Sequence, residues 1–251
     1  MKKSIEFDTV ADLYDYYVKT DLDIGFYLEL CKGRQNILEL MCGTGRVSLP
    51  LIRNGIRLTC VDYSPKMLNV FRLKLKESDK VDILCQDICS LALKERYDLA
   101  FIPFHSLMEI TDKRKRKQAL ERIFEHLMPG GLFFCSLYNP AYRIKSADGS
   151  MRILGRFAMN GNNTLVVSSY NTYSSEENLI RGVQFYEIYG EDNRIIEKRM
   201  LDISFSVISK DEIMETAQSA GFVLKAVYGD YQRQPFSPES LFMNFLFMKP
   251  S

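Results

Sequence analysis

Strand-like and helix-like stretches alternate through the first half of the chain. Short apolar runs of strand length occur at residues 37–40, 58–62, 81–85, 97–104 and 132–138. Between these runs apolar residues recur at helical spacing, as in Leu68, Phe71 and Leu75. A strand–helix repetition of this kind predicts a doubly wound, mostly parallel sheet with right-handed crossovers.

Two helices are expected before the first strand. Residues 8–20 are amphipathic and rich in tyrosine, and Asp8 or Thr9 could cap them. Residues 24–31 carry apolar positions at helical spacing and end at Gly33. Because both helices lie outside the alternation of the sheet, residues 1–34 are expected to form a separate helical segment.

The periodicity changes after Asn139. Alternating apolar and polar positions then predominate, and they fall at residues 164–167, 181–189 and 194–206. We expect three or four antiparallel strands inserted at residues 146–206, and residues 1–145 and 207–251 are expected to form the main domain. In that domain a capping box at residues 209–212 starts a helix, and strand patterns follow at 222–228 and 241–248.

The composition is that of an ordinary globular protein. The 251 residues are 46% hydrophobic and 26% charged, with a net charge of +1, which gives no general attraction to nucleic acid. No stretch approaches the roughly 20 apolar residues of a membrane span, and residues 1–6 lack an apolar signal core. Six cysteines without a C-x-x-C pair indicate neither a zinc site nor disulfides, so a cytoplasmic location is expected.

The most informative stretch is the loop after the first strand. It reads Met41-Cys42-Gly43-Thr44-Gly45-Arg46, and the second strand ends at Asp62. Small residues let the backbone approach a ligand, and an acid at the end of the second strand can accept hydrogen bonds from ribose hydroxyls. The dinucleotide fingerprint is incomplete, because Ser48 stands where its third glycine would fall. A Walker phosphate loop is absent as well, since the chain has no Gly-Lys-Ser/Thr.

The pattern acid-x-x-Cys-Gly-Thr-Gly, with Glu39 as the acid, resembles motif I of the class I S-adenosylmethionine (SAM) methyltransferases. The Leu-x-Pro-Gly-Gly turn at residues 127–131 also resembles this family. The resemblance covers nearly the whole chain and implies a seven-stranded sheet that is closed by a reversed hairpin. It implies SAM as the cofactor, and the inserted sheet is similar to that of small-molecule enzymes, including amino-sugar N-methyltransferases. Met41 departs from the small residue usual in the family, and it is expected to keep a negative φ.

The resemblance also implies roles for individual residues. Glu39 would meet the amino group of the donor, Asp62 its ribose hydroxyls and Asp87 its adenine amino group. Arg46 would meet the donor carboxylate or point to solvent, and residues 1–34 would form a lid over the cofactor. The other cofactor-binding candidates are Tyr14, Met41, Gly43, Thr44, Gly45, Tyr63, Met67, Gln86, Ile88 and Phe104. No metal site is expected.

Methyl transfer from a sulfonium is an in-line displacement that needs neither a metal nor a covalent intermediate. An amine acceptor must lose a proton, so a base is useful. His105 follows the fourth strand, at the edge of the sheet where ligands bind, and is the first candidate. Glu109, Tyr138 and Tyr231 are further candidates. The other histidine, His126, lies off the apolar stripe of its helix and is expected to be solvated.

Several functions remain as alternatives to methyl transfer onto the nitrogen or oxygen of a small molecule. A methyltransferase for RNA or DNA is disfavoured, since residues 102–105 lack the Asn/Asp-Pro-Pro-Tyr/Phe motif. The basic run at residues 113–117 keeps this class open, although a solvated helix face is the simpler interpretation. A SAM-binding protein without catalysis is a third hypothesis, and an NAD-dependent oxidoreductase is a distant fourth. The inserted sheet would hold the acceptor or form a homodimer interface.

Overall fold

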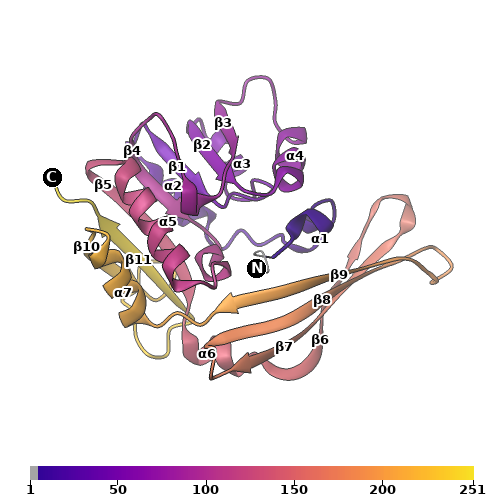
Figure 1. Ribbon diagram of the computed structural model, residues 1–251. Helices are drawn as coiled ribbons and strands as arrows, with labels where there is room; N and C mark the ends of the chain where they lie inside the picture. Colours follow the sequence, from indigo (N-terminus) through magenta and orange to yellow (C-terminus); the bar gives the residue numbers. More distant parts are fainter. Residues whose placement is uncertain (1–4) are drawn as a thin grey trace.

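The computed structural model describes residues 5–251, and its main sheet contains seven strands (Figure 1). Their order across the sheet is β10-β11-β5-β4-β1-β2-β3. The strands are β1 (Ile37–Leu40), β2 (Leu58–Asp62), β3 (Val81–Cys85), β4 (Tyr97–Ile102), β5 (Leu127–Tyr138), β10 (Val223–Tyr228) and β11 (Phe242–Met248). Strands β1 to β5 pair in parallel, and β11 runs antiparallel to both β5 and β10. The predicted parallel sheet with a reversed hairpin is confirmed.

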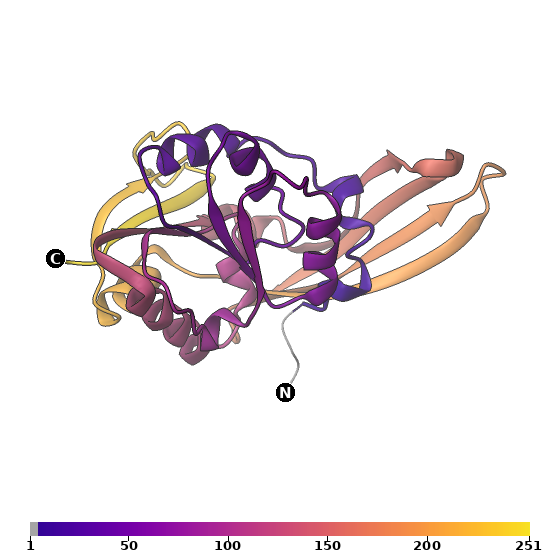
Figure 2. The same cartoon turned by 90° about the horizontal axis from the view of Figure 1, so that it is seen from above.

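Helices cover both faces of this sheet (Figure 2). One face packs on α2 (Ile24–Cys31), α3 (Ser48–Arg53) and α4 (Pro65–Leu73), and the other packs on α5 (Lys113–His126) and α7 (Lys210–Ser219). Consecutive residues of β4 alternate between the two cores: Leu99 and Phe101 belong to the first, and Ala100 and Ile102 to the second. A strand buried on both faces has to be apolar throughout, which explains the continuous apolar run in the sequence.

The insertion forms a separate antiparallel sheet that projects beyond the main body (Figures 1 and 2). Its strands, in order, are β6 (Asp148–Ala158), β7 (Thr164–Ser174), β8 (Leu179–Tyr189) and β9 (Ile195–Ser206). The short helix α6 (Pro140–Lys145) joins it to β5. No strand pattern was identified at the residues of β6, because β-bulges near Gly149 and Leu154 interrupt its alternation and most of its residues are exposed.

The N-terminal segment (residues 5–23) lies between the two sheets, and its conformation differs from the expected helix. It contains only the 3-10 turn η1 (Phe7–Thr9) and the single α-turn α1 (Tyr14–Tyr17). Its apolar residues Ile5, Val10 and Leu13 pack against the inner face of the inserted sheet. Asp8 caps no helix of its own segment, and it accepts hydrogen bonds from Ser64 and from the backbone N–H of Lys66 at the start of α4. Tertiary contacts therefore override the helical pattern.

Two expectations for α5 were wrong. His126 is buried: its Nε2 accepts from the Leu93 N–H at 2.9 Å, and its Nδ1 lies 2.7 Å from the Arg122 carbonyl oxygen. Arg116, the fourth residue of the basic run, is 2% exposed and forms an ion pair with Glu212 at 2.5 Å. The run is therefore not uniformly solvated, because Arg116 links α5 to α7.

Candidate active site

Asp62 holds the loop between β1 and α3 against β2. Its two carboxylate oxygens accept hydrogen bonds from the backbone N–H groups of Gly43, at 2.8 Å, and Ser64, at 2.9 Å. Burial raises the pKa of Asp62, and these two hydrogen bonds oppose the shift. Gly43 and Gly45 have φ values of 56° and 80°, which glycine adopts without strain. The glycine loop (residues 41–46) is therefore shaped by backbone hydrogen bonds to the acid that the sequence singled out.

Left-handed backbone conformations occur in the loops at this edge of the sheet. Met41 has a φ of 56°, so the expectation of a negative φ there was wrong. Phe104 and His105, which follow β4, have φ values of 56° and 64°. Such conformations cost free energy for residues with a Cβ, and they cluster at functional sites. The strained positions therefore mark the carboxyl ends of β1 and β4.

Glu39 is a fully buried carboxyl group with an incomplete set of hydrogen bonds. The Ser48 hydroxyl donates to its Oε2 at 2.7 Å, whereas Oε1 has no hydrogen-bond partner. Burial raises the pKa of Glu39 to about 8, and the Ser48 hydrogen bond and the Arg46 charge oppose this shift. A buried carboxylate oxygen without a partner is costly, and an ammonium group would satisfy it. The residue therefore fits the amino group of SAM.

Acids from the N-terminal segment bind the glycine loop. Asp15 accepts a hydrogen bond from the Thr44 hydroxyl at 2.6 Å. Asp23 accepts two hydrogen bonds from Arg46, each of 2.6 Å, and this pair is largely buried. The Arg46 guanidinium is therefore paired with a protein carboxylate and does not point freely to solvent. Sequence reasoning missed Asp15 and Asp23, because no local pattern shows which distant residue an acid will meet.

The glycine loop and the β4 loop enclose a cavity of about 30 Å³. It is lined by Tyr14, Glu39, Met41, Cys42, Gly43, Thr44, Arg46, Val47, Pro103, Phe104 and Ser106. The structure thus brings together many of the predicted cofactor residues. The volume is about that of one water molecule, far less than SAM requires. Access for SAM therefore requires movement of a neighbouring segment, and Tyr14 is the lining residue that comes from the N-terminal segment.

The other cofactor candidates do not line this cavity. Gln86 and Asp87 close the turn after β3: Asp87 accepts from the Cys89 N–H at 2.8 Å and Gln86 from the Ala92 N–H at 3.1 Å. Met67 reaches to 3.3 Å from the point where a Cβ on Gly43 would lie. Gly45, Tyr63 and Ile88 are likewise outside the lining. A cofactor-binding role for these residues remains a prediction.

His105, in the loop after β4, belongs to a buried hydrogen-bond network. Its Nδ1 lies 3.1 Å from the Ser136 hydroxyl, which donates to the Asn244 side chain at 2.6 Å. The Tyr231 hydroxyl is 2.8 Å from the same Ser136 oxygen. Because the Ser136 proton is used by Asn244, Nδ1 and the Tyr231 hydroxyl both act as donors. The Nε2 of His105 is then the atom with a free lone pair.

Aromatic rings surround the imidazole. The Tyr138 ring lies 3.9 Å from the His105 ring and the Phe242 ring 5.0 Å from it, centroid to centroid. Burial, followed by the charge of Arg143, lowers the pKa of His105 to about 3. The predicted catalytic residues His105, Tyr138 and Tyr231 are therefore brought together around a neutral imidazole, which is a weak base in this state.

Glu109, in the turn η3 (Ser106–Glu109), is a second acid near the cavity. Burial raises the pKa of Glu109 to about 8, and the charge of Asp62 adds to the shift. The Glu109 charge in turn adds to the effect of burial in raising the pKa of Tyr14, a cavity residue. Within residues 5–251, no basic group or hydrogen-bond donor pairs with its carboxylate. As a candidate base, Glu109 was placed behind His105 in the sequence analysis, because only the fold brings it close to Asp62 and Tyr14.

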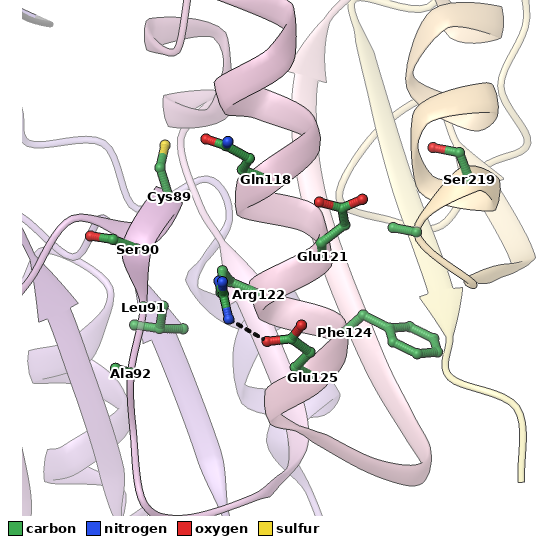
Figure 3. Close-up of a pocket in the computed structure, with 11 residues that line it drawn as sticks. Cys89, Ser90, Leu91, Ala92, Gln118, Glu121, Arg122, Phe124, Glu125 and Ser219 are labelled. Atoms are coloured by element: carbon green, nitrogen blue, oxygen red, sulfur yellow. Dashed lines mark hydrogen bonds and ion pairs between the residues drawn. The ribbon is translucent and has the colours of Figure 1, made fainter.

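A larger groove, of about 660 Å³, lies between η2 (Ile88–Ser90), α5 and the end of α7 (Figure 3). Figure 3 shows polar side chains of α5 along it, among them Arg122 and Glu125, which form an ion pair at 2.8 Å. No residue of the glycine loop lines this groove, and it contains no strained backbone position. We therefore place the active site at the smaller cavity, where the buried acids converge.

Two classes of feature are absent from residues 5–251. None of the described helices is long and apolar enough to span a bilayer. No group of three or more metal-ligating side chains lies close enough together, within that range, to hold an ion. All six cysteines are free thiols.

Comparison with known proteins finds methyltransferases among the similar proteins. Residues 37–131 match the family model of a methyltransferase domain. YqeM of Bacillus subtilis (strain 168), a candidate methyltransferase, is 25% identical over 80% of this chain and 77% of its own. The cypemycin N-terminal methyltransferase of a Streptomyces species is 28% identical, but the match spans only 47% of each chain.

Solved structures share the fold over its full length. The CcbJ methyltransferase of Streptomyces caelestis superposes with a TM-score of 0.80 at 21% identity, over 100% of both chains. SAM-bound CalS10, an amino pentose methyltransferase from Micromonospora echinaspora, gives 0.74 at 16% identity, over 99% of this chain and 100% of its own. A methyltransferase domain is thus matched at residues 37–131, and solved methyltransferases share the fold around it.

Proposed function

We propose that the acceptor is a small molecule and that the methyl group is transferred to an amine nitrogen. The observation that carries this proposal is Glu109, an acid without a partner whose charge acts on Tyr14 of the cofactor cavity. A carboxylate in this place attracts an ammonium group and repels an anionic nucleophile. An N-terminal methyltransferase and an amino pentose methyltransferase are among the similar proteins, which supports an amine acceptor.

Bound SAM supplies a sulfonium methyl group that a nucleophile can displace in line. An amine attacking that methyl group would displace S-adenosylhomocysteine as the leaving group and would have to lose a proton. Glu109 accepts a proton from the amine, and its raised pKa, about 8, suits exchange near neutral pH. Neutral His105 offers Nε2 as a hydrogen-bond acceptor, with the Ser136 contact to Nδ1 holding the ring in orientation.

In this proposal the cofactor lies against the residues named from the sequence. Glu39 Oε1 receives the amino group of SAM, because this oxygen lacks a partner in the structure. Asp62 binds the ribose hydroxyls beside the glycine loop. The N-terminal segment acts as the lid, since Asp15 and Asp23 fasten it to the glycine loop and must move before SAM enters a cavity of this size.

The test is a measurement of S-adenosylhomocysteine release with panels of small amines and of matched alcohols. We expect turnover with amines, and Glu109→Gln should lower kcat by roughly 10²-fold or more, as for removal of an acid–base group. Glu176→Gln changes an exposed acid in the β7–β8 turn and serves as the control. Turnover of alcohols only, or an unchanged rate in Glu109→Gln, would contradict the proposal.

We also propose that the outer face of the inserted sheet forms a homodimer interface. Ile153, Phe185 and Met200 are aligned across three strands of this face by the strand register, with Ser168 between them, and Ile153 and Met200 are 71% and 57% exposed. An exposed apolar row of this kind is typical of an interaction surface. Sedimentation should show a dimer that Met200→Lys dissociates, and a monomeric wild-type protein at tens of micromolar would refute this.

The intracellular location is proposed as cytoplasmic. The support is that the six cysteines are free thiols, of which Cys31, Cys42, Cys60 and Cys135 are buried. Reduced buried thiols are typical of proteins in a reducing compartment. Cell fractionation with an antibody against the native chain tests this, and recovery in an extracellular or membrane fraction would contradict it.

A further inference from the structure

Arg143 lies where the main sheet passes into the inserted sheet. It belongs to α6, which directly follows β5, and its guanidinium carbon lies 5.4 Å from the Tyr138 ring centre and 4.9 Å from that of Phe205. Tyr138 ends β5 and Phe205 is on β9, so the side chain is held between the two sheets. Aromatic contacts of this kind position a guanidinium but leave its N–H donors available.

The charge of Arg143 is not balanced by a protein carboxylate. Arg46 and Arg116 have such partners: Arg46 pairs with Asp23 and Arg116 with Glu212, at 2.6 and 2.5 Å. Within residues 5–251, no acid or carbonyl accepts a hydrogen bond from the side chain of Arg143, and its Nε is buried without a partner. Arg34 shares the unpartnered Nε, but its guanidinium donates to the Asp98 carbonyl oxygen. A buried N–H without a partner costs free energy, which an anionic ligand would recover.

The position of Arg143 relative to the reacting groups is also informative. Its neighbour Tyr138 lies 3.9 Å from the His105 ring, and the Arg143 charge contributes, after burial, to the low pKa of His105. Arg143 does not line the cofactor cavity. The guanidinium is thus one aromatic ring away from His105, on the side where the inserted sheet begins.

We propose that Arg143 binds an anionic group of the acceptor, a phosphate or a carboxylate, while the amine of the same molecule lies near Glu109. The planar guanidinium donates two parallel hydrogen bonds to either anion, which gives both affinity and orientation. The acceptor is then a small amine that carries a negative charge at its other end. This inference rests on the proposed function, because it names the substrate class of the same site.

The protein is first saturated with S-adenosylhomocysteine. Inorganic pyrophosphate and, in a separate experiment, citrate are then titrated into it, and binding is measured by calorimetry. We expect at least one of these anions to bind to the wild-type protein. Binding should weaken roughly tenfold or more in Arg143→Gln, because its charge-assisted hydrogen bonds to the anion are lost. Arg143→Lys keeps the positive charge but cannot donate two parallel hydrogen bonds, so its affinity for the anion should be intermediate. Preference for pyrophosphate would indicate a phosphorylated acceptor, and preference for citrate a carboxylate.

Arg156→Gln is the matched control, because Arg156 is an exposed arginine on β6 of the inserted sheet. It should leave anion binding unchanged. Arg143→Met keeps the stacking and removes the unbalanced charge, so it should fold even if Arg143→Gln does not, and it should also lose the anion. Equal anion binding by Arg143→Met and the wild type, or no anion binding by the wild type, would overturn the inference. Since S-adenosylhomocysteine binding is measured in the same samples, failure of the cofactor site would be recognised separately.

Discussion

Replacing Glu39 with glutamine should change stability and cofactor binding in opposite directions. The folded-state pKa of Glu39 is about 8, against 4.5 for a free side chain. The native state therefore binds the proton more tightly than the unfolded state. Between pH 4.5 and 8 the free energy of unfolding falls as pH rises, by up to about 1.4 kcal/mol per pH unit, because the buried group has to ionise.

The glutamine side chain has nearly the same shape and does not titrate. The stability of Glu39→Gln relative to the wild type should therefore rise by about 2–3 kcal/mol between pH 6 and pH 9, which urea unfolding at several pH values measures. SAM should bind roughly 10- to 150-fold more weakly to the variant, since a charge-assisted hydrogen bond contributes about 1.5–3 kcal/mol. Glu125→Gln, on the exposed side of α5, is the control. A stability difference that does not vary with pH would refute this reasoning.

Two further substitutions test the glycine loop and the ion pair that holds the N-terminal segment against it. Gly45→Ala should destabilise the fold by about 2–5 kcal/mol and abolish SAM binding, because φ is positive and a Cβ would collide with the Phe71 ring. Gly33→Ala meets no neighbouring atom and should cost only about 1–2 kcal/mol in urea unfolding, so equal losses would argue against the collision. Asp23→Asn leaves the Arg46 guanidinium poorly paired and should destabilise by about 3 kcal/mol. This loss of stability should be accompanied by faster amide exchange in the N-terminal segment. Unchanged exchange would contradict a role for the Asp23–Arg46 pair in holding this segment against the glycine loop.

Local pattern was sufficient to predict the main sheet and the glycine loop. Consecutive residues of β4 enter different cores, so both faces of the strand are apolar. This arrangement requires a continuous apolar run, which is recognisable in the sequence. Gly43, Gly45 and Asp62 were likewise recognisable, since the loop geometry demands these residue types.

Features that depend on distant partners could not be predicted from local pattern. The pattern of residues 8–20 is helical, but Val10 and Leu13 pack against an inserted sheet that begins only at Asp148. His126 lies off the apolar stripe of α5 and is buried because the Leu93 N–H reaches its ring. Arg143 has no sequence signature at all, because what distinguishes it is the absence of a partner in three dimensions.

The central claim is that the glycine loop and Asp62 form a SAM site. Calorimetric titration with SAM and with S-adenosylhomocysteine tests it most directly, with NAD as the control ligand. Asp62→Ala and the exposed-strand variant Asp82→Ala would be measured alongside. The account predicts binding of both sulfur ligands that is lost in Asp62→Ala and kept in Asp82→Ala, and no binding of NAD. Absence of SAM and S-adenosylhomocysteine binding in the folded wild-type protein would contradict it.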